Sequence, residues 1–157
     1  MKIHLLCIGK TDERYLLDGI SKYESRLRHY INFRMTIIPD IKNVKNLSVA
    51  DQKAKEAKLI EKLFLPTDVV ILLDEKGASF TSASFALYLE KQALASVQQL
   101  VFVIGGPYGF DASIYARANK RISLSAMTFS HQMVRLFFVE QLYRAYTIQR
   151  GEPYHHE

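Results

Sequence analysis

The stretch Ile122 to Tyr146, "ISLSAMTFSHQMVRLFFVEQLYRAY", joins a short apolar strand to a long apolar helix. The strand is predicted over Ile122 to Leu124. The connection after it, Ser125 to Phe129, has no glycine and no charge. We expect this connection to lie deep in the core, where its backbone groups need hydrogen-bond partners. Packing against other loops or an adenine ring, which has a donor and an acceptor edge, would provide them.

The helix that follows is predicted to be capped by Ser130 or Thr128 and to be buried on every side. A terminal helix of a small monomer would leave one side in water, so we expect a second subunit to cover it in a twofold dimer. Apolar residues cover nearly its whole circumference: Met133, Val134, Leu136, Phe137, Phe138, Val139, Leu142, Tyr143, Ala145 and Tyr146.

Outside this stretch, predicted strands and helices alternate along the chain. The strands are apolar throughout, which is typical of a mainly parallel sheet covered by helices on both faces. We therefore expect an α/β fold with five or six strands, and a single domain over residues 1–157. The other strands are predicted over Ile3–Ile8, Phe33–Ile37, Val69–Leu73 and Leu100–Ile104, and the other helices over Asp12–Tyr30, from Ser48, over Thr81–Ala95 and after Asp111.

The composition is that of a globular protein, with 157 residues, 48% hydrophobic and 24% charged. No apolar run is long enough to span a membrane, no signal peptide is evident, and Cys7 is the single cysteine, so we expect a cytoplasmic protein. A net charge of +5 favours a polyanionic partner such as RNA. Many basic globular proteins bind no polyanion, so composition alone leaves both readings open.

Three predicted strand ends carry "LLDEKG", "VIGGPYGF" and "ISLSAMTF", and ligands of open α/β sheets bind beyond the carboxyl ends of strands. Gly105 and Gly106 would permit a close approach of a ligand, although a simple turn explains them at least as well. "IGKT" and "GGPYG" do not match the phosphate-loop or dinucleotide patterns. No histidine spacing indicates a metal site, so we expect no metal.

Glu140 and Arg144 are four residues apart on the last predicted helix and can pair. The pair is either structural or holds the arginine ready for a phosphate. The tail after this helix, "RGEPYHHE", is expected to be exposed.

Three motifs together resemble the RlmH family, the ribosomal RNA large-subunit methyltransferases of the SPOUT class. They are "VFVIGGPYGF", "SLSAMTFSH" and "EQLYRAYTIQRGEPYHH", and the likeness extends over the whole chain. The resemblance implies a deep trefoil knot near the C-terminus that binds S-adenosyl-L-methionine, and a homodimer whose sites are completed near the partner. It also implies methylation of N3 of a pseudouridine in 23S rRNA within the assembled 70S ribosome.

The resemblance further implies two groups of site residues. On the target side, His155 would accept or relay the proton of N3, with Glu140 as the alternative, and Arg144 would position a phosphate or favour the ionised base. Tyr154 or Tyr108 would stack on a base taken out of its helix. The residues expected to contact the cofactor are Leu73, Gly105, Leu124, Ser125, Ala126, Met127, Thr128 and Phe129.

The chain departs from the family pattern at two places. His156 and then Glu157 follow "PYH" where the family usually has Arg or Lys, which predicts weaker phosphate contact there. Ser130 stands where proline is usual, and serine keeps a good helix cap.

Rival functions remain open at this point. One is a non-catalytic RNA-binding module associated with the ribosome, which would need no cofactor. Another is a SPOUT methyltransferase acting on tRNA, which fits a chain this short less well. A flavodoxin-like nucleotide enzyme would need a phosphate loop that the chain does not show.

Overall fold

The computed structural model describes residues 1–156 and contains one five-stranded sheet in the order β2-β1-β4-β3-β5, with every neighbouring pair parallel. The predicted parallel α/β fold is therefore confirmed. The strands are β1 (Lys2–Ile8), β2 (Asn32–Ile38), β3 (Val69–Ser79), β4 (Gln99–Ile104) and β5 (Lys120–Ser123). The helices are α1 (Arg14–Leu27), the 3-10 turn η1 (Val44–Asn46), α2 (Val49–Glu61), α3 (Ser82–Leu94), α4 (Ala112–Arg117) and α5 (Met133–Gln149).

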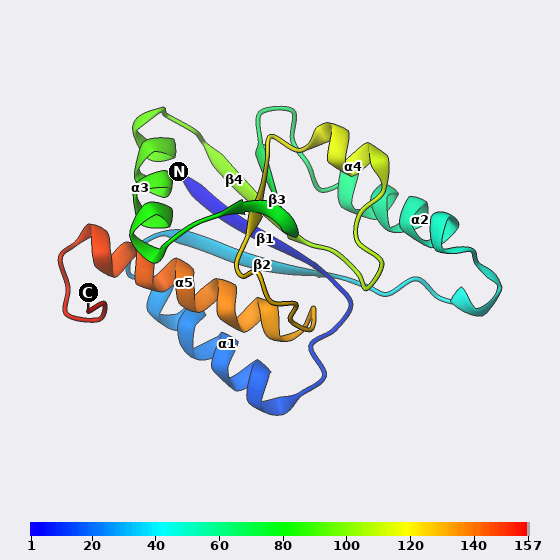
Figure 1. Cartoon of the computed structure of the whole chain (residues 1–157), viewed down its shortest axis with the longest axis horizontal. Helices are drawn as coiled ribbons and strands as arrows, with labels where there is room; N and C mark the ends of the chain where they lie inside the picture. Colours follow the sequence, from blue (N-terminus) through cyan, green and yellow to red (C-terminus); the bar gives the residue numbers. More distant parts are fainter. Residues whose placement is uncertain (157) are drawn as a thin grey trace.

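Helices cover both faces of the sheet, as Figure 1 shows. Successive residues of a strand point to opposite faces, so the apolar strands feed two separate cores. In β1, Leu5 and Cys7 pack with residues of α1, α3 and α5, whereas Leu6 and Ile8 pack with residues of α2 and α4. A strand buried on both faces needs apolar residues throughout, which explains the apolar runs of β1, β3 and β4. The edge strand β2 alternates at its start, where Asn32 and Arg34 are exposed.

Strand β3 is longer than predicted. The charged residues after Leu73 suggested that the strand ends there, but it continues to Ser79 and pairs with β5 a second time, through Ala78 and Ile122. Residues 74–77 form an irregularity between the two paired segments. Gly77 is needed at this point, because a Cβ on it would lie 2.5 Å from the backbone nitrogen of Ile122.

Helix α5 lies between α1 and α3 on the sheet, and this arrangement changes one prediction. Phe138, Val139 and Leu142 are fully buried, while Phe137 is 37% exposed. The neighbouring helices thus cover the sides that we expected a second subunit to cover. Most of the apolar circumference of α5 is therefore covered within one chain. Only its exposed residues, such as Phe137, are left for contact with a second subunit.

Side chains cap several helices. Ser48 accepts a hydrogen bond from the backbone of Asp51, and Thr81 forms a capping box with Ser84. Of the two candidates before α5, Ser130 accepts from the backbone of Met133 at 3.1 Å, whereas the Thr128 hydroxyl donates to Glu75 instead. Among residues 1–156, no helix has the length and apolar character to cross a membrane.

Candidate functional site

A cavity of about 630 Å³ opens at the carboxyl ends of β4, β3 and β5. These three strands are neighbours in the sheet, so the three segments that follow them meet at one edge. We call this the strand-end cavity. Seven of the eight predicted cofactor residues line it, namely Leu73, Gly105, Leu124, Ser125, Met127, Thr128 and Phe129, and Ala126 is the one that does not.

The glycines after β4 permit a tight turn and also line the cavity. The Gly109 amide donates to the Gly106 carbonyl at 3.2 Å, which closes a tight turn with Pro107 and Tyr108 at its tip. Gly109 has φ +78°, a conformation that glycine adopts without strain. A Cβ on Gly105 would lie 3.0 Å from the Phe110 ring. The turn explanation is therefore confirmed, and the same turn forms one side of the cavity.

The connection after β5 lies at the surface and not in the core, so this expectation was wrong. Ala126, Met127, Thr128 and Phe129 are exposed, and Met127 is 73% exposed. The connection curves around the cavity, and its own side chains fix it: the Ser125 hydroxyl accepts from the Met127 amide at 2.9 Å. The absence of charge thus does not reflect burial in the core.

Two carboxylates from the charged stretch of β3 stand at the cavity. Asp74 accepts a hydrogen bond from the Tyr115 hydroxyl at 2.8 Å, and Glu75 accepts one from Thr128 at 3.2 Å. The second bond links the irregular part of β3 to the connection after β5. Lys76 lines the cavity beside the two carboxylates, so the cavity combines apolar walls with a charged rim of two carboxylates and one ammonium group.

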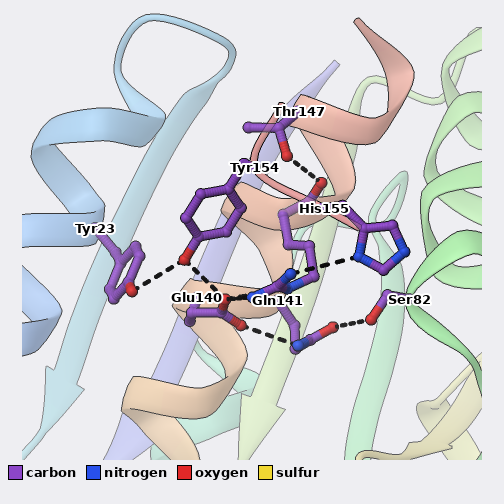
Figure 2. A network of polar contacts seen from close by, with 8 residues as sticks. Tyr23, Ser82, Glu140, Gln141, Thr147, Tyr154 and His155 are labelled. Carbon is purple, nitrogen blue, oxygen red and sulfur yellow. Dashed lines mark hydrogen bonds and ion pairs between the residues drawn. The ribbon is translucent and has the colours of Figure 1, made fainter. Parts of the chain in front are cut away.

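Four of the five predicted target-side residues lie on α5 and the tail, outside the cavity lining, and Figure 2 labels Glu140, Tyr154 and His155 among them. The fifth, Tyr108, lines the cavity. We call Glu140, Arg144, Tyr154 and His155 the α5 cluster. Glu140 Oε1 accepts from Arg144 at 2.5 Å and from the Tyr154 hydroxyl at 3.0 Å, and Arg144 Nη1 lies 3.4 Å from His155 Nδ1. The Arg144 guanidinium also lies over the Tyr154 ring, 4.7 Å from its centre.

The tail is only partly exposed, in contrast to the prediction. It turns back over α1, where the Tyr30 hydroxyl donates to Glu152 and the Tyr23 hydroxyl lies 3.1 Å from that of Tyr154. Tyr154 and His155 are half-buried as a result, whereas His156 is exposed. The contacts with α1 hold the tail against α5 and bring its two aromatic residues to Arg144.

The surroundings of the α5 cluster fix the charge states of two of its members. Burial, followed by the hydrogen bonds to Tyr23 and Glu140, raises the pKa of Tyr154, which keeps this phenol protonated and acting as a donor. The hydrogen bond to Glu140 raises the pKa of Arg144 further above its ordinary value. Arg144 and Glu140 therefore form a pair in which the two charges compensate each other.

The strand-end cavity and the α5 cluster are connected by one helix. Val134 lines the cavity near the start of α5, and Glu140 follows six residues later, about 9 Å further along the axis at 1.5 Å per residue. Arg144 lies one further turn away. In a single chain the two groups of predicted residues are therefore not brought together.

Sequence reasoning missed Arg135, which is fully buried in the first turn of α5. Its guanidinium donates to the carbonyls of Ile8 and Gly9 and to the Thr11 hydroxyl, at 2.6, 2.8 and 2.9 Å. It therefore ties the start of α5, beside the cavity, to the end of β1. A signal was present, because Arg135 shares the helical stripe of Phe138 and thus lies on the side of α5 that faces the core.

Comparison with known proteins identifies the class of this arrangement. A family model described as "Predicted SPOUT methyltransferase" matches residues 1–155. A solved structure titled as a probable methylase family protein from Haemophilus influenzae shares the fold, with a TM-score of 0.54 at 10% identity, covering 99% of this chain and 70% of that one. The chain therefore belongs to the SPOUT methyltransferase family.

Close relatives narrow the class further. The chain is 59% identical over 157 residues to a protein of Parabacteroides distasonis, with 100% of each chain covered. It is 57% identical over 157 residues to one of Flavobacterium johnsoniae, again with 100% covered, and 56% identical over 156 residues to one of Christiangramia forsetii, with 99% covered. All three are named ribosomal RNA large subunit methyltransferase H, and the chain is a member of this RlmH group.

Proposed function

We propose that this chain methylates N3 of a pseudouridine in the 23S rRNA of the assembled ribosome, with S-adenosyl-L-methionine as the methyl donor. The relatives named above act, by their names, on the large ribosomal subunit RNA, and the identity extends over the full chain. The observation in the structure that carries the proposal is the convergence of three strand ends on one cavity, which seven of the predicted cofactor residues line. Action on the ribosome would take place in the cytoplasm. The whole chain would form one domain.

The strand-end cavity fits this donor in size and in charge. Its volume of about 630 Å³ lies within the range of sites that hold small molecules. The donor carries a positive sulfonium, and the carboxylates of Asp74 and Glu75 outweigh the single ammonium group of Lys76, so the rim favours a cation. The exposed connection after β5 leaves backbone groups accessible to an adenine or methionine moiety. The residues present are therefore suited to S-adenosyl-L-methionine.

When bound, S-adenosyl-L-methionine supplies an electrophilic methyl group, so the chain's own residues must align the acceptor and remove one proton. His155 is the proposed proton acceptor. A guanidinium has only donors, so the contact with Arg144 faces the lone pair of His155 Nδ1. We propose that Arg144 turns to the RNA when the substrate binds, which frees Nδ1 to take the proton of N3.

Glu140 is less suited to this role. Its carboxylate already accepts hydrogen bonds from Arg144, Tyr154 and Gln141, and proton uptake would weaken all three. Glu140 instead orients Arg144 and Tyr154. Tyr154, kept protonated, provides a half-buried ring beside Arg144 on which a displaced base can stack.

We propose that the chain acts as a homodimer, because one chain keeps the cavity and the α5 cluster apart. Met127 and Phe129 at the cavity and the neighbouring Phe137 are exposed apolar residues, with the two phenyl rings 4.9 Å apart. A twofold partner seated there would lie close to the cavity with its own α5 cluster. A trefoil knot is proposed at the same end of the sheet, supported by the match of the SPOUT methyltransferase family model to residues 1–155.

The activity is tested with methyl-labelled S-adenosyl-L-methionine and unmethylated 70S ribosomes, with free 50S subunits in parallel. We expect label in 3-methylpseudouridine from 70S particles. Label in another nucleoside or only in tRNA would disprove the assigned substrate. If the protein bound no S-adenosyl-L-methionine, it would act as an RNA-binding module without catalysis.

Mixing two inactive variants tests the shared site. Gly105→Val obstructs the cavity and Arg144→Gln disables the α5 cluster. If the partner completes each site, a mixed dimer has one intact cavity facing one intact cluster, and activity returns on mixing. If each chain is complete by itself, the mixture stays inactive. Replacing His155 by alanine should abolish turnover while ribosome binding is retained.

A further inference from the structure

A second arginine adjoins the α5 cluster from α1. We propose that Arg26 binds a backbone phosphate of the RNA substrate next to the reacting base. This inference rests on the proposed function, because it assumes an RNA substrate at the α5 cluster. It adds a phosphate contact from Arg26 to the contact with RNA proposed above for Arg144.

Aromatic rings connect the two arginines. The Arg26 guanidinium carbon lies 5.6 Å from the ring centre of Tyr23 and 5.4 Å from that of Tyr143. Tyr143 packs edge-on against Tyr154, with 4.8 Å between ring centres. The Arg144 guanidinium in turn lies over the Tyr154 ring. Arg26 therefore lies on the continuous aromatic surface that holds the α5 cluster.

The two arginines differ in how their charge is compensated. Arg144 forms an ion pair with Glu140 at 2.5 Å. Within residues 1–156, no carboxylate forms an ion pair with Arg26. A charge on this surface without a carboxylate partner is available to an external anion, whereas Arg144 must first leave Glu140.

The two tyrosines also prepare Arg26 for binding. A guanidinium stacked on aromatic rings keeps the donors of its edge available, and a phosphate accepts two of them at once. Arg26 is half-buried, so its side chain is already restricted before the RNA arrives. Less conformational entropy is then lost on binding than for an extended surface lysine. The charge and the geometry together favour a phosphate oxygen as the ligand.

The salt dependence of ribosome binding tests this assignment. Arg26→Met removes the charge and keeps an apolar side chain on the rings, and Arg26→Gln is a second variant in case one of them is unstable. Arg14→Gln is the matched control, because it removes one positive charge from the same helix at an exposed residue that pairs with Asp18. Binding to unmethylated 70S ribosomes is measured over a series of salt concentrations.

We expect Arg26→Met to lower the slope of log K against log salt by about 0.7 to 0.9, the value for one phosphate contact. The KM for ribosomes should rise about tenfold with unchanged kcat, and S-adenosyl-L-methionine affinity should stay as in the parent. Arg26→Lys should keep the parent slope, since lysine also contacts phosphate as a point charge.

Equal slopes for the parent, Arg26→Met and Arg14→Gln would overturn the inference. The proposed function would still stand in that case if the parent labels the ribosome. A parent that neither labels nor binds 70S particles would instead disprove the proposed function itself. The two failures are therefore distinguished by the parent protein alone.

Discussion

The strand-end cavity adjoins the start of α5 and the α5 cluster lies further along the same helix, but the two are built in opposite ways. The cavity is lined mainly by the segments that follow three neighbouring strands, including the glycine turn after β4, and by apolar side chains such as Leu73 and Phe110. The α5 cluster consists of side chains that satisfy each other, with Glu140 as the common acceptor. The first is formed by the sheet before any ligand arrives. The side chains of the α5 cluster must break hydrogen bonds with each other before they can bind the substrate.

This difference predicts which kind of change each region tolerates. The cavity depends on close backbone packing, so an added atom in its frame should affect folding. The α5 cluster depends on hydrogen bonds near the surface, so its changes should affect turnover while the fold persists.

Gly77→Ala should have the largest effect on stability. A Cβ at this position would lie 2.5 to 2.7 Å from backbone atoms of Arg121 and Ile122, and neither strand can move without opening the sheet at the cavity. We expect a loss of about 3 kcal/mol or more in the free energy of unfolding, measured by urea denaturation.

Gly151→Ala in the tail is the matched control for Gly77→Ala. Gly151 has φ +65°, and nothing lies within 4 Å of a Cβ built on it. The cost should therefore be only the conformational strain, about 1 kcal/mol. Similar losses for the two variants would show that packing at Gly77 is not what makes the cavity frame sensitive.

Arg135→Met should destabilise the junction between the two regions. The substitution leaves the carbonyls of Ile8 and Gly9 without their donor in the core, and we expect a loss of about 2 to 3 kcal/mol by the same measurement. Arg135→Lys should restore part of it. If Arg135→Met were as stable as the parent, the start of α5 would not depend on its link to β1.

The sequence predicted that three strand ends meet at one edge of the sheet, because strands and their direction follow local rules. Apolar runs gave the strands, and the parallel arrangement brought their ends together. Strand β3 went beyond its predicted end because Ala78 pairs with Ile122, a contact over 44 positions that no local pattern of the charged residues reveals. The exposure of Met127 likewise depends on where the connection runs over the sheet edge.

The α5 cluster was predicted less completely. The spacing of Glu140 and Arg144 indicated their pairing, and the family resemblance supplied Tyr154 and His155. Tyr23 lies on α1, and the contact of its hydroxyl with that of Tyr154 joins residues 131 positions apart. Such contacts follow from the packing of the tail on α1, which the sequence pattern does not encode locally.

Tyr154→Phe should affect turnover and spare the cavity. It removes the hydroxyl that donates to Glu140 and contacts Tyr23, while the ring stays available for stacking. We expect kcat to fall about tenfold, which corresponds to about 1.4 kcal/mol. S-adenosyl-L-methionine affinity, measured by calorimetry, should be unchanged. A tenfold loss of that affinity instead would show that the α5 cluster takes part in forming the cavity.

Tyr23→Phe separates the two contacts of the Tyr154 hydroxyl. It removes the bond between the two phenols and leaves the bond from Tyr154 to Glu140 in place. If orientation by Glu140 is what matters, this variant should keep most of the parent activity. A loss as large as that of Tyr154→Phe would assign the effect to the contact with α1.

Thr128→Val should have the smallest effect, and it tests whether the cavity is as fully formed as its backbone suggests. The Thr128 hydroxyl donates to Glu75 at 3.2 Å on the exposed rim, and valine keeps the shape of the side chain without this donor. An exposed hydrogen bond to a carboxylate is worth about 0.5 kcal/mol, so S-adenosyl-L-methionine affinity should fall only about twofold with unchanged stability. Glu75→Gln should weaken binding of the cationic donor more than that of the uncharged thioether product, because it also removes a negative charge from the rim. If Thr128→Val alone lowered the affinity tenfold or more, the connection after β5 would need this link to hold its shape, and the cavity would resemble the α5 cluster in depending on side-chain bonds.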